Sequence, residues 1–388
     1  MRPAAPLFVE PVTLAADPRV TRRAARSLGR ADRHALVLWL AAHIGVLIYM
    51  LLVEPDGGNV FERLTPWDAE NFIAIAEHGY DGPPGMPDPE RLTAFFPGMP
   101  LLLRVLDPFF ADLRVAIVLV SFVAGAVAVV ALCRLSEAAR PGSGPWTVLA
   151  FLLSPFAVFL YAGYSEALFL AFALPAWLLA RQGRWTGAAL CAAGASLVRI
   201  SGLFLAFALI VEFAIGRYGL RHPAGRRRVA LLAVPVLPIF GYLGYQWWRT
   251  GDMLAWKHAE EVFWGRTAVW PWEALGNTWE RSLTEPVLAA SYRQEICAAA
   301  VLAALTVALL VRRRWAESAY IAPQAAAFLT LSSFYLSVGR ASLLWWPLWI
   351  AIGAAGASRP WLYALCLAVT APIMAVNVGS FTTGAWVG

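Results

Sequence analysis

The residues best suited to chemistry form an acidic cluster in the peptide 67–80, WDAENFIAIAEHGY. Its first carboxylate, Asp68, comes soon after the first long apolar run, and a carboxylate near lipid is costly to keep unless it has a task. In such a place it could act as a general base that removes a proton from an attacking hydroxyl. We therefore predict that Asp68 is the catalytic residue of a membrane enzyme. The alternative is structural, because an aspartate also caps a helix well, here the helix expected over residues 69–77.

Basic side chains that could hold an anionic group occur in segments expected on the same side of the membrane as Asp68. Such cations stabilise a phosphate while negative charge builds on it. The candidate phosphate-binding residues are Arg199, Arg249, Lys257, His258, Arg266 and Arg340. Arg199 and Arg340 lie at the ends of apolar runs, where the alternative is an arginine that only extends to the lipid headgroups.

Further residues could line a substrate site beside these groups. The candidates are aromatic, acidic or imidazole side chains: Trp67, Glu70, Glu77, His78, Phe95, Phe96, Tyr164, Glu166, Trp256 and Trp264. Aromatic rings at headgroup level suit both a prenyl chain and the face of a sugar. For Glu70, Glu77 and His78 the alternative is a solvated helix face. Glu166 could instead cap a helix.

The elements that must position these residues are membrane-spanning helices. Of the 388 residues, 60% are hydrophobic and 14% are charged, which excludes a soluble globular protein. About eleven apolar runs recur along the chain, and a run of roughly twenty residues crosses a hydrocarbon core. They cover 35–53, 114–133, 146–162, 166–180, 186–198, 200–216, 229–248, 291–311, 317–338, 341–357 and 361–378. The prediction is an all-α polytopic membrane protein with a single domain over 1–388.

The charges between the runs predict the orientation in the membrane. Most of the 31 Lys and Arg residues and few of the 25 Asp and Glu residues fall on one side of this arrangement, which the positive-inside rule assigns to the cytoplasm. The basic segment 1–34 is then cytoplasmic and the carboxyl terminus lies outside. Two long outer loops, 54–113 and 249–290, are expected to carry short amphipathic helices. Because the basic residues occur in short loops, they indicate topology and no nucleic-acid partner.

Several motifs together resemble one known family. WDAENFIAIAEHGY followed by AFFPGMP (94–100) is similar to the first luminal loop of the GPI mannosyltransferase II (PIG-V) family, membrane glycosyltransferases of the GT-C type. Further similar elements occur in order at 154–156 with 162–169, at 199–203, and at 251–256 with 264–266. The resemblance implies transfer of mannose from a polyprenyl-phosphate-mannose donor to a glycolipid acceptor, with inversion, on the non-cytoplasmic face. Since the composition is rich in arginine and alanine, the expected setting is a bacterial plasma membrane with an inositol-lipid or related acceptor.

The chemistry of such a donor fits the candidate residues. Its phosphate leaving group is already a good anion, so one base and several cations suffice, whereas a glycosidase needs a second carboxyl group to protonate the leaving oxygen. Asp68 with Glu70 could hold a divalent ion through water. With so many arginines available to the phosphate, we expect no metal and no other cofactor.

Other classes of protein remain open from the sequence. They are a glycosyltransferase that uses another lipid-phosphate sugar or a protein acceptor, a non-catalytic partner subunit, and a transporter of a lipid or sugar. A transporter would place its cavity at the membrane midplane and often shows an internal repeat. An enzyme of the predicted type would instead bring Asp68 and two or more of the cations to a common outer cavity.

Overall fold

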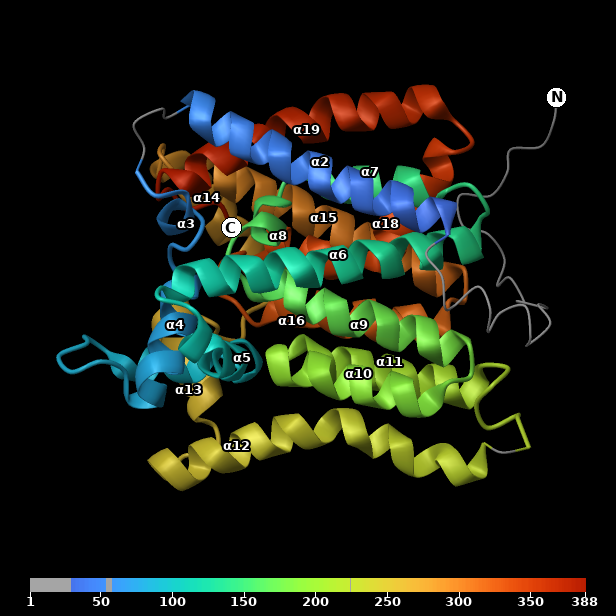
Figure 1. Cartoon of the computed structure of the whole chain (residues 1–388), viewed down its shortest axis with the longest axis horizontal. Helices are drawn as coiled ribbons and strands as arrows, with labels where there is room; N and C mark the ends of the chain where they lie inside the picture. Colours follow the sequence, from blue (N-terminus) through green and yellow to red (C-terminus); the bar gives the residue numbers. More distant parts are fainter. Residues whose placement is uncertain (1–28, 54–57, 224) are drawn as a thin grey trace.

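A computed structural model describes residues 29–53, 58–223 and 225–388, and every regular element in these residues is a helix. Most of the predicted basic segment 1–34 lies outside the described residues. The long helices run side by side along the horizontal axis of Figure 1, and short helices gather at the left end. The prediction of an all-α polytopic membrane protein is confirmed as a fold class.

The α-helices are α2 (Arg30–Val53), α3 (Val60–Arg63), α4 (Asp68–His78), α5 (Gly98–Leu106), α6 (Leu113–Ala139), α7 (Gly144–Leu152), α8 (Val158–Tyr161), α9 (Ser165–Arg181), α10 (Trp185–Val198), α11 (Ser201–Ile215), α12 (Leu237–Thr250), α13 (Ala255–Trp264), α14 (Pro271–Thr284), α15 (Ala289–Val311), α16 (Trp315–Thr330), α17 (Val338–Ala341), α18 (Trp346–Gly356) and α19 (Pro360–Thr382). The 3₁₀ helices are η1 (Gly79–Asp81), η2 (Pro89–Ala94), η3 (Asp107–Phe109), η4 (Arg226–Val236) and η5 (Ser342–Leu344).

Each predicted apolar run overlaps a helix, but the helices differ in length. Five are long and apolar enough to cross a membrane: Arg30–Val53, Leu113–Ala139, Arg226–Thr250, Ala289–Val311 and Pro360–Thr382. The other runs correspond to shorter helices, among them α10, α11 and α18. The number of spans therefore stays a prediction.

One predicted run, 317–338, is wrong over its last residues. The helix α16 ends at Thr330, and no regular element covers 331–337. The backbone here pairs with the second outer loop, since the Val269 N–H donates to the Thr330 carbonyl at 2.9 Å and the Ser333 N–H donates to the Gly265 carbonyl at 3.2 Å. These bonds replace helical ones and bring the loop after α13 against the segment that leads to α17.

The helices approach one another closely where one of them carries a small residue, as is common in membranes. At Gly194 of α10 an added Cβ would lie 2.6 Å from the Phe172 ring of α9. At Gly125 of α6 it would overlap the Trp39 ring of α2. Large side chains at these positions would push apart the helices that carry the site.

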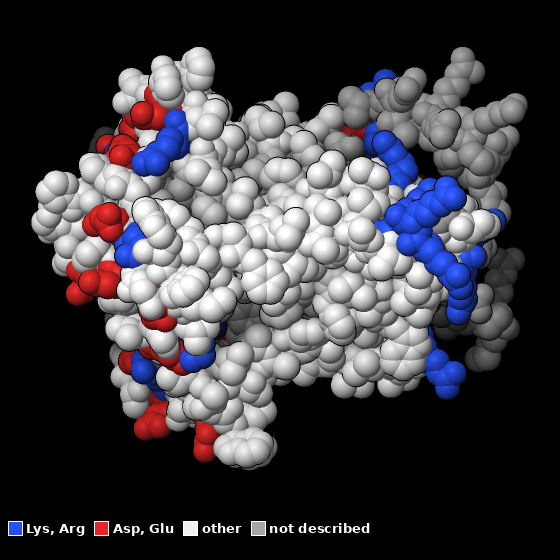
Figure 2. All heavy atoms as spheres, turned by 90° about the horizontal axis from the view of Figure 1, so that it is seen from below, with Lys and Arg blue, Asp and Glu red and all other residues white. Residues whose placement is uncertain are grey.

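The charged residues lie at the two ends of the molecule. Figure 2 shows a broad belt almost free of charge between an end where Asp and Glu gather among a few basic side chains and an end where the visible charges are nearly all basic. The acidic end carries α4, α5, α13 and α14 (Figure 1). The short helices expected in the two outer loops are therefore present. The helix α14 is amphipathic, as it buries Ala274, Thr278 and Ser282 and exposes Trp272 and Trp279.

Candidate active site

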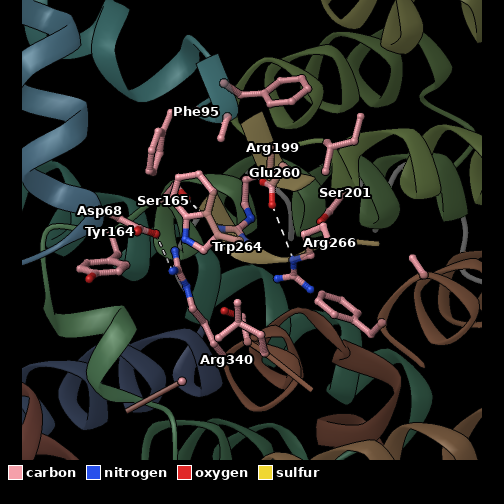
Figure 3. A pocket seen from close by; sticks show the side chains of 18 of the residues that line it. Asp68, Phe95, Tyr164, Ser165, Arg199, Ser201, Glu260, Trp264, Arg266 and Arg340 are labelled. Carbon is pink, nitrogen blue, oxygen red and sulfur yellow. Dashed lines mark hydrogen bonds and ion pairs between the residues drawn. The ribbon is translucent and has the colours of Figure 1, made fainter. Parts of the chain in front are cut away.

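A cavity of about 520 Å³ is lined in large part by residues of the two predicted outer loops. The helices of these loops, α4 and α13 among them, lie at the acidic end (Figure 1). Its lining comes from both outer loops and from the ends of α10, α11 and α16 (Figure 3). Predicted site residues make up part of this lining: Trp67, Asp68, Phe95, Phe96, Tyr164, Arg199, Trp256, Lys257, Trp264, Arg266 and Arg340. Residues more than two hundred positions apart in the sequence thus share one cavity.

Asp68 does not cap its helix. The N–H groups of Glu70 and Asn71 donate to the Trp67 carbonyl, and the Asp68 side chain turns into the cavity. There its Oδ2 accepts a hydrogen bond from Arg340 Nη1 at 2.6 Å. Trp67 before it has a φ of 62°, a left-handed conformation that is unfavourable for a bulky residue and often marks a functional site. The capping alternative is therefore wrong.

The guanidinium group of Arg340 contacts two carboxylates and two aromatic rings. Its Nε donates to Glu166 Oε1, and its Nη1 bonds Asp68. The guanidinium carbon lies 4.6 Å from the centre of the Tyr164 ring and 5.0 Å from that of Phe159, where a cation is attracted to the ring face. A guanidinium with these partners points inward, so the headgroup alternative is wrong for Arg340.

Glu166 joins the two arginines of the site. It is fully buried at the start of α9, and its Oε1 also accepts from Arg199 Nη1 at 2.7 Å. Arg199 donates further to Ser165 Oγ at 2.7 Å, so it too points inward and not to lipid headgroups. Glu166 lies behind the arginines and does not line the cavity. Asp68, Glu166, Arg199 and Arg340 form a neutral quartet, two carboxylates with two guanidinium groups.

The helix α13 supplies the facing wall. Trp256, Glu260 and Trp264 follow one another at four-residue intervals, so they share one face of the helix, and all three line the cavity. Arg266 Nε lies 3.6 Å from Glu260 Oε2, an ion pair longer than a hydrogen bond, and both residues line the cavity. Burial raises the pKa of Glu260 above its usual range, and the nearby Arg266 opposes this shift.

Aromatic contacts tie the two outer loops together at the cavity. The rings of Phe95 and Trp264 meet edge to face with centres 5.7 Å apart, and those of Phe96 and Trp256 with centres 6.1 Å apart. Such pairs fix the rings and leave apolar faces toward the cavity.

Several predicted residues lie away from the cavity. Glu70, Glu77 and His78 are outside its lining, and each is exposed on α4, which fits the solvated-face alternative. His258 is half-exposed and bonds Asp252 through Nδ1 at 2.6 Å. These four residues form no hydrogen bond or ion pair with Asp68 or Arg340.

Two further candidates have partners of their own. Arg249 bonds Asp81 at 2.9 Å and lies outside the cavity lining. Lys257 lines the cavity but is paired with Glu261 one helical turn away. Of the predicted cations, Arg199, Arg266 and Arg340 are therefore the ones best placed to meet an anionic ligand inside the cavity.

Sequence reasoning missed several lining residues, among them Ser165, Ser201, Glu260 and Glu261. Glu260 could have been found, since it lies midway between two predicted tryptophans on one helix face. The two serines lie within the family-like elements 162–169 and 199–203, but nothing in their residue type indicates a place in the site. In the described part of the chain, no group of three or more His, Cys, Asp or Glu residues is arranged to hold a metal ion. The expectation of a metal-free site stays a prediction.

Comparison with known proteins gives consistent matches. A family model described as Mannosyltransferase (PIG-V) matches residues 46–240. Curated relatives named GPI alpha-1,6-mannosyltransferase 2 are 38% identical over 152 residues in Cricetulus griseus and Homo sapiens and 39% in Rattus norvegicus. Each match covers 36% of this chain and 29% or 30% of the relative, so the match spans less than a third of the relatives' length. No solved structure matches the chain.

Proposed function

This chain belongs to the PIG-V mannosyltransferase family, and from that premise we propose that it transfers mannose from a polyprenyl-phosphate-mannose donor to a glycolipid acceptor. The observation that carries the proposal is the arrangement of Asp68, Arg340 and Arg199 around one cavity at the acidic end of the molecule. It supplies a base and two cations to the same space. A donor that is a phosphodiester and an acceptor that is an alcohol need these groups.

In the proposed reaction an acceptor hydroxyl attacks the anomeric carbon of mannose from the side opposite the phosphate. Asp68 takes the hydroxyl proton as the new carbon–oxygen bond forms. The bond from the anomeric carbon to the phosphate oxygen breaks, and its electron pair stays on the polyprenyl phosphate. Arg199 and Arg340 stabilise the charge that grows on this phosphate. Since attack is in line, the configuration of the anomeric carbon inverts.

The pairing of Asp68 with Arg340 couples donor binding to the base. In the structure Asp68 Oδ2 accepts a hydrogen bond from Arg340 Nη1 at 2.6 Å, so this oxygen is occupied before the donor binds. The donor phosphate competes for the same guanidinium. When Arg340 turns to the phosphate it stays anchored by Glu166, and Asp68 is released to accept the proton.

The aromatic and acidic face of α13 fits a sugar. Trp256 and Trp264 offer flat apolar surfaces, and Glu260 between them can accept hydrogen bonds from hydroxyl groups. With three arginines beside the cavity, we propose that the phosphate is neutralised by these side chains without a divalent metal.

The proposal places the acidic end on the non-cytoplasmic face. The opposite end is rich in arginine, and the positive-inside rule assigns such an end to the cytoplasm. The composition supports a bacterial plasma membrane. A cavity at one end of the molecule favours an enzyme over a transporter with a midplane site.

Cysteine labelling tests this orientation. Asp88→Cys and Glu273→Cys should react with an impermeant maleimide in intact cells, because both positions are exposed at the acidic end. Arg227→Cys, exposed at the opposite end, should react only after the cells are permeabilised. Labelling of position 227 in intact cells would contradict the orientation.

The activity itself is tested with purified protein, a polyprenyl-phosphate-mannose and a panel of inositol-lipid and other glycolipid acceptors. Mannosylated lipid is expected with the lipid-linked donor, in the presence of a chelator, and not with GDP-mannose. A polyprenyl-phosphate donor with a different sugar and a peptide acceptor test the other specificities that the fold class allows. Transfer from GDP-mannose without any lipid carrier would contradict both the donor class and the outer site.

Arg340→Ala should raise the apparent KM for the lipid donor by at least about tenfold, because a hydrogen bond to a charged phosphate is lost already in the ground state. Arg340→Lys should recover only part of this, since an ammonium group cannot bond Glu166 and the phosphate with a planar fork. Lys257→Ala should have a smaller effect, because Lys257 is half-exposed and paired with Glu261. An unchanged donor KM in Arg340→Ala would remove Arg340 from the donor site.

A further inference from the structure

A second fully buried carboxylate, Glu295, lies on α15 in a helix otherwise suited to cross the membrane. It does not line the cavity. Its Oε2 accepts hydrogen bonds from the backbone N–H of Val338 at 2.7 Å and of Gly339 at 3.2 Å. These two residues come immediately before Arg340. A carboxylate buried at this depth is costly, so its contact with the segment that carries Arg340 calls for a physical reason.

The segment that carries Arg340 contains backbone N–H groups that need acceptors. The helix α17 has four residues, and the N–H groups at the start of a helix have no partner within it. Ser337 before it has a φ of 61°, an unfavourable conformation for a residue with a side chain. A Cβ at Gly339 would overlap the Phe156 ring, so the turn is also enclosed sterically. Glu295 supplies the missing acceptor, because its Oε2 accepts from two of these N–H groups at once.

Glu295 differs from buried carboxylates on two other helices. Glu212 on α11 pairs with Arg181, and Glu317 on α16 pairs with Arg314. The hydrogen-bond partners of Glu295 are backbone groups at the start of α17, Val338 and Gly339 among them, and its Oε1 has no hydrogen-bond partner. The carboxyl group is therefore directed at the backbone of the turn.

We propose that Glu295 is a positioning residue for the transfer reaction. It fixes the backbone that carries Arg340, while Glu166 fixes the guanidinium group, so that Arg340 reaches both Asp68 and the donor phosphate. This inference rests on the proposed function, because it assigns Arg340 to the donor.

The test uses the full-length protein with Glu295→Ala, Glu295→Gln and a control variant, Glu212→Gln, in which another buried carboxylate of a membrane helix is removed. Glu295→Ala should raise donor KM at least about tenfold, with a smaller fall in kcat. Glu295→Gln should stay within about threefold of the wild type, since its amide oxygen can still accept from both N–H groups. Glu212→Gln should leave donor KM unchanged even if it lowers stability.

A double-mutant cycle separates positioning from general stabilisation. In an Arg340→Ala background, Glu295→Ala should change kcat/KM less than about twofold, because the residue that it positions is gone. An equal loss in both backgrounds, or equal donor KM values in Glu295→Ala and the wild type, would overturn the inference.

Hydrogen exchange gives a readout that needs no activity. The amides of 338–340 should exchange faster in Glu295→Ala than in the wild type, whereas those of α10 should not change. Unchanged exchange at 338–340 would also overturn the inference. Failure of the wild-type protein to transfer mannose from any lipid donor would contradict the proposed function instead, so the two failures are distinguishable.

Discussion

Asp68→Asn is expected to lower turnover at least about 100-fold, the usual minimum for loss of a general base. Asparagine has the same shape as aspartate, and its amide oxygen can still accept from Arg340, so the fold should persist. Because the amide cannot take the proton of the acceptor hydroxyl, the loss should fall on kcat. Donor KM should not rise, since the phosphate no longer competes with a carboxylate for Arg340. Initial rates with the lipid-linked donor measure this effect.

The matched control is Glu70→Gln on the same helix. Glu70 is exposed and lies outside the cavity lining, so this variant loses one carboxylate near the site without touching it. It should retain wild-type turnover. If Asp68→Asn kept more than about a tenth of normal turnover, Asp68 would not be the base.

Glu166→Gln is expected to destabilise the protein and abolish transfer together. Glu166 is fully buried and serves both Arg199 and Arg340. Removal of one partner from a buried ion pair typically costs about 3–5 kcal/mol, because the remaining charge is left without compensation. Thermal unfolding in detergent should show a clearly lower melting temperature, and the arginines should no longer be aligned for the phosphate.

A second substitution separates charge balance from catalysis. Glu166→Gln combined with Arg199→Gln restores neutrality of the quartet, so part of the lost stability should return while activity stays absent. Glu77→Gln, an exposed carboxylate on α4, is the control and should melt like the wild type. A wild-type melting temperature in Glu166→Gln would mean that the arginines find other partners.

The sequence predicted the membrane class and the residue types of the site because both are local signals. Apolar runs mark helices, and Asp68, Arg199 and Arg340 stand out as charges at their ends. The partnership of Asp68 with Arg340 is not local, since 272 positions separate them. Only the packing of the helices brings these two residues together. The same packing leaves His258 and Glu77 outside the cavity lining.

Two kinds of detail could not be predicted. The segment 331–337 is as apolar as its neighbours, yet it leaves the helix because its backbone pairs with the loop after α13. Glu295 lies within an apolar run, and its partners are backbone groups, which carry no side-chain signature. In both cases, at the end of α16 and at Glu295, the local structure depends on hydrogen bonds between distant parts of the chain.

The neutral quartet has a consequence for the catalytic cycle as a whole. A donor phosphodiester carries one negative charge, and the released carrier phosphate carries roughly two at neutral pH. In the proposed reaction Asp68 loses its charge by taking a proton at the same moment, so the total charge inside the cavity is equal before and after transfer. The chemical step then only moves charge toward the arginines, and no ion has to cross a poorly solvated region. The departure of the doubly charged carrier and the return of the proton to water do carry charge. Ionic strength and membrane potential should therefore change the rates of carrier release and proton return. The rate of the transfer step itself should change little.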